Sequence, residues 1–481
     1  MNLLETQLSK VIQGEIHTEE QFRKFYSVDA SSYQVIPKII VIPKNEKDII
    51  NTIKIAREFK TSVTVRGAGT GLVGSALNYG VILDMKNFDS IKIKKNYVIV
   101  GSGAIKGKLD KALEKNKKFF PPNPSIGSFC SIGGMLGNNS SGSRSLKYGS
   151  MIDNVIEVTI IDGNGNKIIL PKNKNFSNKI QKKIKINSKK IPNVSKNSSG
   201  YRIDKILSKN DSHKIIIGSE GTLGIVTSAK LKIKNIPKKR TLFVIEYNSI
   251  KNAIKDCIFV NDTNPSAIEF VDKITLQQIN HRFQKNTKCL LFVEYDEKTN
   301  QNDKKIKLLI SGKIVKKLTK KQDIEQWWKY RDLSLFYSLK SIKKDNRIPH
   351  VIEDAAVPIG KLTELFSILE KISKKFKTKS IVYGHIGNGN LHVRLIGERK
   401  KPSLIKNIAR YYFEEIIKIG GTITAEHGDG LARSEFIKKQ YGKTNYQTFQ
   451  EIKKLFDPKN ILNPGKIISN KSTIIRNFEK L

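Results

Sequence analysis

An α+β fold built from two or three structural units is predicted by three features of the sequence. The chain has 481 residues, which exceeds the size that one hydrophobic core normally serves. Short β runs separated by glycine-rich turns fill the first half, and β runs alternate with helical patterns in the second half. Hydrophobic residues make up 38% and charged residues 27%, which is typical of a globular chain and not of a disordered one.

The elements of the first half are predicted from periodicity. Residues 1–35 are interpreted as a helix with a polar lead-in, and residues 46–59 as a helix between two β runs. Predicted strands are 39–42, 62–65, 80–83, 98–100, 155–162 and 214–217. The segment 172–196 is rich in Lys and Asn and is interpreted as a surface insertion. A strand ending at Lys234 is followed by a proline and a basic cluster, which indicates a boundary near residues 236–239.

The second half alternates β and α patterns, which predicts a small α/β unit with an antiparallel sheet. The predicted strands are 242–247, 267–270 and 289–295. The predicted helices are 250–260 and 404–419. Asp-Pro and Asn-Pro turns lie in the final segment, residues 456–467.

The charge balance is strongly basic, with 87 Lys and Arg against 44 Asp and Glu and a formal net charge of +43. The lysines are scattered along the chain and are not clustered with aromatic residues as in nucleic-acid binders. We therefore expect no nucleic-acid partner. A basic surface still favours anionic substrates and anionic lipid headgroups.

Targeting signals and cysteine chemistry narrow the expected cellular location and the kinds of metal or disulfide site. The first twenty residues contain no apolar run of the signal-peptide kind, and no stretch approaches the ~20 apolar residues of a membrane span. The three cysteines are far apart and form no C-x-x-C pair, so they predict neither disulfides nor an iron–sulfur cluster. We expect a cytoplasmic protein, and peripheral association with the inner membrane remains open.

Three glycine-rich segments are candidates for loops that cradle phosphate groups. The first, residues 66–71, follows a β run, and its closely spaced glycines would let backbone N–H groups converge on a pyrophosphate. It leads into another β run, unlike the G-x-G-x-x-G loop that opens a helix. The second, residues 121–143, mixes Gly, Ser and Asn with proline and apolar residues, which predicts an ordered loop. The third comprises residues 218–226.

Two segments of the second half contain three of the chain's seven histidines. An Asn-Gly pair at 388–389 lies between two β runs, which predicts a two-residue hairpin turn. That turn would place His385 directly opposite His392, with Cβ atoms about 5 Å apart, a suitable spacing for two imidazoles on one metal ion. In the second segment, Glu426 and His427 stand side by side and can supply a further ligand and a base.

Together the glycine-rich segments resemble the FAD domain of the vanillyl-alcohol-oxidase or p-cresol-methylhydroxylase type. The nearer resemblance is to the branch of D-lactate dehydrogenase, glycolate oxidase and D-2-hydroxyglutarate dehydrogenase, and residues 197–201 resemble a further element of that domain. The resemblance implies a two-subdomain FAD-binding domain, an α/β cap with an antiparallel sheet, and a C-terminal segment returning to the FAD domain. The implied division is 1–35 N-terminal helical lead-in, 36–236 FAD-binding domain, 237–425 substrate or cap domain, and 426–481 C-terminal segment.

The resemblance also implies how FAD is bound. Covalently flavinylated relatives have a His at the position of Thr70, so non-covalent FAD is implied here. The implied cofactor-binding residues are Arg66, Gly67, Ala68, Gly69, Thr70, Gly71, Pro124, Ser125, Gly133, Gly134, Asn138, Ser141, Gly142, Glu220, Gly221 and Ile225.

The histidine segments resemble the G-H-x-G-[DN]-G-N-x-H and E-H-G segments of the same branch. In that branch two His and the Glu bind a divalent metal, and the His of the E-H-G segment acts on the substrate hydroxyl. By position, this implies that His385, His392 and Glu426 are metal ligands, for Zn or Mn, and that His427 is the catalytic base.

Three further residues are implied to bind substrate. Arg331 lies in a W-x-x-R element whose Arg binds the substrate carboxylate, and a guanidinium can donate two parallel bonds to a carboxylate. Asn390 lies in the histidine segment. Arg394 stands where some relatives have a substrate-binding Asn, so the substrate itself stays open.

The implied activity is FAD-dependent oxidation of a small D-2-hydroxy acid, such as lactate, glycolate or 2-hydroxyglutarate, to the 2-oxo acid. Similar relatives continue into a cysteine-rich iron–sulfur region, which is lacking here. Electrons would therefore pass to an iron–sulfur subunit, a quinone or another carrier. Alternatives are a flavoprotein subunit of a glycolate-oxidase-like complex and a flavin oxidase of another alcohol. A homodimer also remains open.

Overall fold

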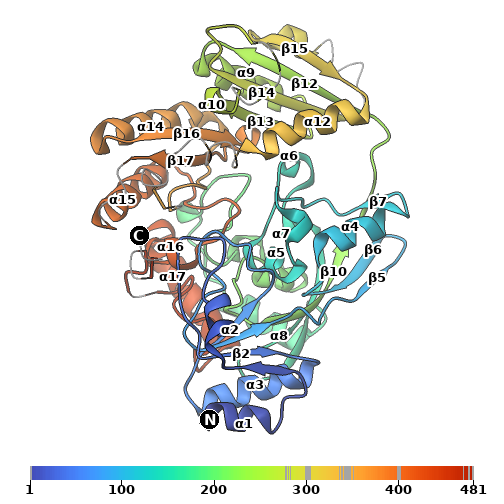
Figure 1. Cartoon of the computed structure of the whole chain (residues 1–481), viewed down its shortest axis with the longest axis vertical. Helices are drawn as coiled ribbons and strands as arrows, with labels where there is room; N and C mark the ends of the chain where they lie inside the picture. The colour runs from blue at the N-terminus through green and yellow to red at the C-terminus, as the bar shows by residue number, and fades with distance from the viewer. Residues whose placement is uncertain are drawn as a thin grey trace.

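The computed structural model describes most of the chain. The described residues are 3–276, 279, 281, 283–297, 305–334, 336, 340, 348–349, 351–397, 402–469, 471–474 and 477–478. Within these ranges the strands form sheets of four, five, two and six strands. Figure 1 shows the six-stranded sheet and its helices at one end of the molecule, and the sheets of the N-terminal half at the other.

A small mixed sheet begins the fold, with strand order β1-β2-β4-β3. Its strands are β1 (Glu15–His17), β2 (Ile39–Ile42), β3 (Val63–Arg66) and β4 (Val81–Asp84). Its helices are α1 (Leu3–Ser9), α2 (Glu20–Phe25) and α3 (Glu46–Glu58). The Asn45 side chain caps α3, and the helix buries Ile49 and Ile53 in a core shared with β2 and β4.

A five-stranded antiparallel sheet follows, with order β5-β6-β10-β8-β9. Its strands are β5 (Ile91–Ile93), β6 (Tyr97–Gly101), β8 (Val155–Ile161), β9 (Lys167–Leu170) and β10 (Ile225–Lys232). A two-stranded sheet pairs β7 (Lys118–Phe119) with β11 (Lys234–Asn235). The helices and 3-10 turns are α4 (Lys106–Glu114), η1 (Gly127–Phe129), α5 (Ile132–Asn138), α6 (Ser145–Tyr148), α7 (Met151–Asn154), α8 (Lys174–Lys183), η2 (Ser188–Lys190), η3 (Ile203–Lys205) and η4 (Lys209–Ile216).

A six-stranded antiparallel sheet forms the second half, with order β15-β12-β14-β13-β16-β17. Its strands are β12 (Arg240–Tyr247), β13 (Ala267–Asp272), β14 (Cys289–Asp296), β15 (Lys313–Leu318), β16 (Lys379–Gly384) and β17 (His392–Ile396). Its helices and turns are α9 (Ile250–Asn261), α10 (Lys273–Leu276), α12 (Lys321–Asp332), η6 (Ile359–Lys361), α14 (Leu362–Phe376), η7 (Ile386–Asn388) and α15 (Pro402–Lys418).

Both faces of this sheet are covered, which explains its continuous apolar strands. Phe243 and Ile245 share one core with the apolar residues of α9, α14 and α15. Leu242 and Val244, which point to the opposite face, pack with the tryptophans of α12. The helix α12 therefore lies on the other side of the sheet from α9 and α14.

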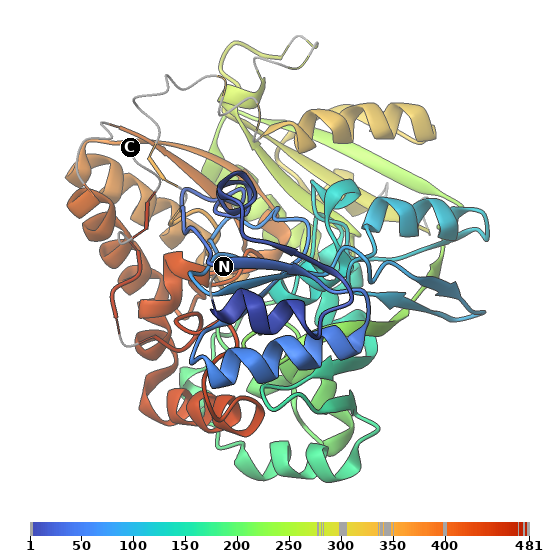
Figure 2. The same cartoon turned by 60° about the horizontal axis from the view of Figure 1, so that its bottom comes forward.

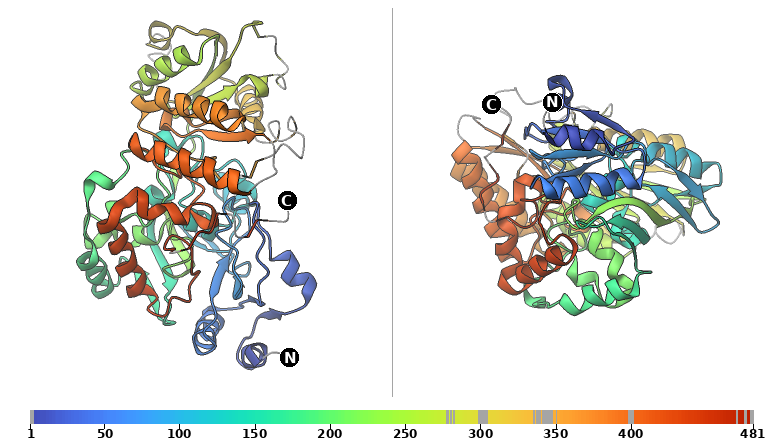
Figure 3. Two further views of the ribbon diagram at one scale, coloured as in Figure 1. Left: turned by 90° about the vertical axis from the view of Figure 1, so that its left-hand side faces the viewer. Right: turned by 90° about the horizontal axis from the view of Figure 1, so that it is seen from below.

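The C-terminal segment returns to the N-terminal half. It contains α16 (Gly430–Arg433), η8 (Ser434–Phe436) and α17 (Ile437–Phe456). Figures 2 and 3 show α17, in red, beside the green helices and turns of the N-terminal half, where it contacts α8. After α17, the Asn463 amide donates hydrogen bonds to the backbone oxygens of Ser75 and Glu220.

Ion pairs also join the two halves through α6 and the residue before it. The Arg144 guanidinium donates two hydrogen bonds to Glu294, of 2.6 and 2.8 Å, and lies over the Trp328 ring. Lys147 and Tyr148 both bind Asp296 on the same strand, β14. Figure 1 shows α6 reaching toward the six-stranded sheet. These contacts hold the sheet against the N-terminal half.

The predicted α+β fold, with its antiparallel cap sheet and returning C-terminal segment, is confirmed. The predicted strand at 214–217 is wrong, because a capping box formed by Ser208 and Asp211 starts the 3-10 turn η4 there. The predicted surface insertion 172–196 is mostly exposed but contains α8 and ends at the buried Lys196. The four-part domain division stays a prediction. Among the described residues, no helix is long and apolar enough to cross a membrane.

Candidate active site

A cavity of about 400 Å³ is lined by both halves of the molecule. The loop after β3, the loop before α5 with α5 itself, and the loop before β10 form one side of it. The other side is formed by Arg331, Asp332, Tyr383, His392, Arg394, Glu426 and His427. Its volume lies within the range of small-molecule and cofactor sites.

The glycines of the cavity wall allow close packing of the backbone. A Cβ atom on Gly67 would lie 2.0 Å from the Ser131 Oγ, and one on Gly133 would lie 2.8 Å from Ser102. Gly69 has a φ of +67°, in the left-handed region that favours glycine. The loop after β3 and the helix α5 can therefore meet at the cavity only because these positions lack side chains.

Most residues predicted to contact the cofactor line this cavity. They are Arg66, Gly67, Ala68, Gly69, Thr70, Gly71, Pro124, Ser125, Gly133, Gly134, Asn138, Ser141, Glu220 and Gly221. Two others lie behind the wall. Gly142 pairs with Asn123 through a backbone bridge, and Ile225 belongs to the core of the first sheet.

The predicted hairpin register at the histidines is wrong. Tyr383, and not His385, pairs with His392 across β16 and β17. The chain instead makes the 3-10 turn η7 (Ile386–Asn388), and Gly389 follows with a φ of +67°. Hydrogen bonds from Val357 to Gly389 and from Asn390 to Ala355 hold this loop, so tertiary contacts override the local Asn-Gly signal.

Three imidazoles nevertheless converge on one carboxylate oxygen. The Nε2 atoms of His385, His392 and His427 lie 3.0, 3.2 and 3.7 Å from Glu426 Oε1. The rings of His392 and His427 stack, with centroids 5.1 Å apart and an interplanar angle of 12°. All four side chains are buried except His427, which is 23% exposed. The structure thus brings together the four residues predicted as metal ligands and base.

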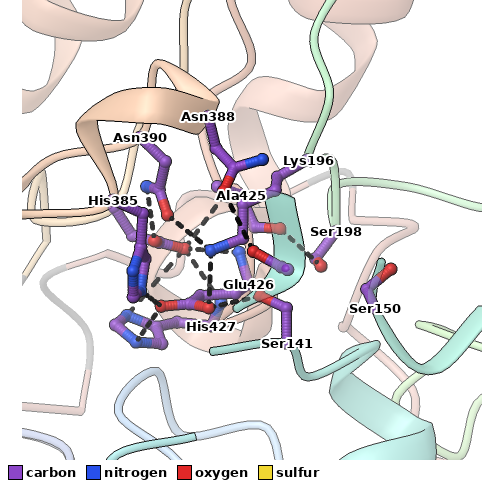
Figure 4. Close-up of polar contacts among 12 residues, drawn as sticks. Ser141, Ser150, Lys196, Ser198, His385, Asn388, Asn390, Ala425, Glu426 and His427 are labelled. Atoms are coloured by element: carbon purple, nitrogen blue, oxygen red, sulfur yellow. Dashed lines mark hydrogen bonds and ion pairs between the residues drawn. The ribbon is translucent and has the colours of Figure 1, made fainter. Parts of the chain in front are cut away.

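The second oxygen of Glu426 is held from the opposite side. Lys196 Nζ donates to Oε2 over 3.0 Å, and Ser141 Oγ donates to the same atom over 2.5 Å. Figure 4 shows His385 and His427 on one side of the carboxylate and Lys196 and Ser141 on the other. Burial raises the pKa of Glu426, but Lys196 and His385 outweigh it and hold that pKa well below its usual range.

Asp354 fixes the loop that carries Glu426 and His427. Its Oδ2 accepts hydrogen bonds from the Thr424 hydroxyl and from the backbone N–H groups of Ala425, Glu426 and His427. Its Oδ1 accepts a hydrogen bond from the Asn390 amide. A fully buried carboxylate with these donors is a rigid anchor for the loop.

Glu269 orients two of the predicted site residues at once. Its Oε1 lies 2.6 Å from His385 Nδ1, and its Oε2 accepts a 2.5 Å hydrogen bond from Arg331 Nε. When His385 donates its Nδ1 proton to Glu269, the lone pair of Nε2 is directed toward Glu426. A carboxylate behind the imidazole is the usual second partner of a metal-binding histidine.

The three residues predicted to bind substrate occupy different surroundings. Arg331 and Arg394 both line the cavity. Within the described ranges, Nε and Nη1 of the buried Arg394 have no hydrogen-bond partner. Asn390 is buried behind the cavity wall, where its oxygen accepts a bond from Lys196 and its amide donates to Asp354. It therefore supports the site from behind.

His427 is held by a carboxylate that the sequence analysis missed. Its Nδ1 lies 2.6 Å from Glu353 Oε1. Burial lowers the pKa of His427, but Asp354 and Glu353 outweigh it and raise that pKa to about 9.

Lys196, Glu269, Glu353 and Asp354 were not predicted as site residues, and the segment 265–270 was given only a structural role. Lys196 is one lysine among many in its segment. The pair Glu353 and Asp354 did carry a signal, because two acidic residues lie between apolar neighbours that are buried. A buried acidic pair requires partners, and such a pair can be read as a site candidate.

Comparisons with known proteins agree with this architecture. Residues 37–170 match the FAD binding domain model, and residues 236–467 match the model of the C-terminal domain of FAD linked oxidases. The glycolate oxidase subunit GlcD of Bacillus subtilis is 28% identical over 467 residues, covering 93% of this chain and 92% of that protein. The mitochondrial D-lactate dehydrogenase [cytochrome] of Arabidopsis thaliana is 26% identical over 484 residues, covering 96% and 79%.

A solved structure shares the fold at lower identity. Alkyldihydroxyacetonephosphate synthase superposes with a TM-score of 0.70 at 17% identity, covering 97% of this chain and 86% of that chain. This likeness concerns the fold alone. With the family matches, it confirms the p-cresol-methylhydroxylase type of FAD-binding fold that the glycine-rich segments predict.

Proposed function

The chain belongs to the FAD-linked oxidases and is an FAD-dependent oxidoreductase, and from that premise we propose that it oxidises a small D-2-hydroxy acid to the 2-oxo acid. The observation that carries the proposal is the convergence of three imidazole Nε2 atoms on Glu426 Oε1. Of this cluster, His392, Glu426 and His427 line the same cavity as the loops predicted to bind FAD. The similarity to glycolate and D-lactate enzymes supports the same substrate class.

The cavity fits a non-covalent FAD. Its wall contains the glycines whose Cβ atoms would collide with neighbouring segments, and the buried Arg66 supplies positive charge beside them. Bound FAD supplies the oxidant, because its ring accepts a hydride from the substrate. Thr70 lies at the cavity with its hydroxyl 3.5 Å from Cys130 Sγ.

Denaturation is expected to release the flavin completely, because Thr70 offers no imidazole for covalent attachment. The measurement is mass spectrometry of the polypeptide after acid precipitation, together with the flavin absorbance of the supernatant. A polypeptide mass increased by one FAD would contradict the non-covalent assignment.

The donor set also fits a divalent metal ion. Two imidazoles and one carboxylate are ligands that suit Zn or Mn. We assign His385, His392 and Glu426 as the ligands. Ligand atoms of Asp354, His392, Glu426 and His427 also lie within 4.8 Å of one another. Asp354 is the weaker candidate, because its Oδ2 already accepts four hydrogen bonds.

The assigned roles follow from these positions. A metal ion held by His385, His392 and Glu426 would supply a Lewis acid and would lower the pKa of the substrate hydroxyl. Arg331 and Arg394 orient the substrate carboxylate at the cavity wall. His427 takes the hydroxyl proton on Nε2, the ring atom that faces Glu426. Asp354 and Glu353 raise the pKa of His427. The positive charge of a bound metal ion would oppose that effect and would favour the neutral, proton-accepting form of His427.

Electrons then have to reach an acceptor outside the described site. The three cysteines are buried and free, and Cys130 lies at the cavity while Cys257 and Cys289 lie in α9 and β14. They cannot jointly bind an iron–sulfur cluster. We propose a separate acceptor, namely an iron–sulfur subunit, a quinone or another carrier.

An anaerobic bleaching screen tests the proposed function. Lactate, glycolate, malate and 2-hydroxyglutarate, in each available enantiomer, are added to the FAD-loaded protein under anaerobic conditions. We expect at least one D-acid or glycolate to bleach the visible flavin absorbance within seconds. Bleaching by an aldonolactone or simple alcohol, and by none of the 2-hydroxy acids, would contradict the proposal. A protein that binds FAD and is bleached by none of these compounds would be an electron-relay subunit.

Replacement of Lys196 by Met is expected to weaken metal binding about 10- to 100-fold. The substitution removes the cation that holds Glu426 Oε2 and leaves that oxygen with the Ser141 hydroxyl as its remaining donor. The measurement is metal affinity by competition with a chromophoric chelator. Lys205→Met, which replaces an exposed lysine further along the same segment, is the control. Unchanged affinity in Lys196→Met would rule out this role.

A further inference from the structure

Glu353 is a buried carboxylate that touches the predicted base directly. It is 1% exposed, and its backbone oxygen accepts a hydrogen bond from Val393 on β17. Its Oε1 lies 2.6 Å from His427 Nδ1 and accepts a 3.1 Å hydrogen bond from Arg433 Nη2. Arg394 Nη2 lies 3.8 Å from the second oxygen. His392 Nδ1 lies 4.0 Å from that same oxygen, so two guanidinium groups and two imidazoles surround this carboxylate.

We propose that Glu353 is a positioning residue for His427, which fixes both the tautomer and the orientation of the imidazole. This inference rests on the proposed function, in which His427 is the base. When Nδ1–H is donated to Glu353, the lone pair of the ring lies on Nε2, the atom directed at Glu426 and the cavity. The opposite tautomer would place a proton where the substrate proton must be accepted.

Glu353 and Asp354 hold different parts of His427. Asp354 Oδ2 accepts the backbone N–H of His427 over 2.8 Å and lies 3.8 Å from its ring Nδ1. Asp354 therefore fixes the loop, and Glu353 fixes the ring. Stacking on His392 holds the ring plane, while the hydrogen bond to Glu353 sets its rotation within that plane. The remaining edge of His427 lines the cavity.

The surroundings keep Glu353 in place and charged. Arg433 is fully buried, and its other N–H groups donate to the backbone oxygens of Val351 and Gly428. Arg433 therefore holds the Glu353 carboxylate in a fixed position. Burying a charge costs several kcal/mol unless it is compensated. A carboxylate compensated by two arginines and aimed at a catalytic imidazole resembles the buried carboxylate that orients the base in serine proteases.

The test replaces Glu353 by Gln, which keeps the shape and removes the charge. Flavin reduction is followed by anaerobic stopped-flow with D-lactate, or with the acid that bleaches fastest in the screen. We expect the limiting rate of reduction to fall about 100- to 10,000-fold, with FAD content, metal content and substrate half-saturation changed less than about threefold. Glu246→Gln is the matched control, because Glu246 is a buried carboxylate bound to Thr287 away from the cavity.

A double variant separates positioning from a general structural effect. Because Glu353 acts through His427, Glu353→Gln should cause no further loss in a His427→Gln background. Equal losses in both backgrounds, or a loss below threefold in the wild-type background, would overturn the proposal.

A spectroscopic readout works even if no 2-hydroxy acid bleaches the flavin. In protein labelled with ¹⁵N-histidine, the His427 Nδ1–H proton should resonate far downfield and disappear in His427→Gln. It should move upfield in Glu353→Gln, because a neutral amide is a weaker acceptor than a carboxylate. An unmoved resonance would refute the contact between Glu353 and His427. Failure of the bleaching screen alone would refute only the proposed function.

Discussion

Replacement of His427 by Ala is expected to lower the rate of flavin reduction at least about 1,000-fold, or about 4 kcal/mol in activation free energy. His427 is the predicted acceptor of the hydroxyl proton, and its Nε2 lies 3.7 Å from Glu426 Oε1. The loops predicted to bind FAD belong to other segments, so the variant should still bind FAD with unchanged stoichiometry. The measurement is anaerobic stopped-flow reduction of the FAD-loaded variant by the best acid of the screen.

A matched control for this variant is His17→Ala. His17 is a half-buried histidine of β1 that stacks on Phe22 and does not line the cavity. The flavin of the His17→Ala variant should be reduced at the wild-type rate. If the His427→Ala variant reduces its flavin at the wild-type rate, His427 is not the base. If the variant loses FAD, its low rate says nothing about proton transfer. For that reason FAD content is measured first, and the rate is expressed per bound flavin.

The Glu426→Gln variant is expected to lose the metal and at least about 1,000-fold in activity. The amide removes the anionic ligand and leaves Lys196 without its carboxylate partner in a buried site. Elemental analysis of the purified, FAD-loaded variant should show metal falling from about one ion per chain to a trace. Added Zn or Mn should restore part of the activity, because His385 and His392 remain.

The outcome that contradicts this assignment is full metal content in Glu426→Gln. In that case the ion would be held by another set, and Asp354, His392 and His427 are the remaining candidates within 4.8 Å of one another. Glu246→Gln again serves as the control for replacing a buried carboxylate. It should keep both metal and activity.

The sequence predicted the elements whose formation depends on local pattern. The helix after Asn45 and the strands from Ile39 to Ile42 and around Val81 follow from capping and apolar runs. The prediction of a strand at 214–217 failed because it, too, was based on a local pattern. An apolar run of isoleucines indicates a buried segment but not its backbone, and the Ser208 capping box decided in favour of a 3-10 turn.

The site was only partly predictable, because its assembly depends on contacts between segments that are distant in the sequence. His385, His392, Glu426 and His427 were predicted from their motifs, and the structure brings them together. The predicted route to that proximity, a tight hairpin, was wrong. The pairing with Glu353 joins residues 74 positions apart. No local pattern encodes which carboxylate a histidine will meet at that separation.

Lys196 illustrates the same limit. Its partner Glu426 lies 230 positions away in sequence. With 87 basic residues in the chain, nothing marks this lysine as the one whose ammonium is buried. The burial of a lysine beside a carboxylate becomes visible only once the C-terminal segment lies on the N-terminal half.

We propose that a metal held by His385, His392 and Glu426 acts with FAD on a 2-hydroxy acid. The most direct measurement compares anaerobic flavin bleaching by the best acid in metal-replete protein and in protein stripped by a chelator, at equal FAD content. We predict bleaching within seconds in the first, a rate at least about 100-fold lower in the second, and recovery when Zn or Mn is returned. Equal bleaching rates with and without the metal would contradict the account.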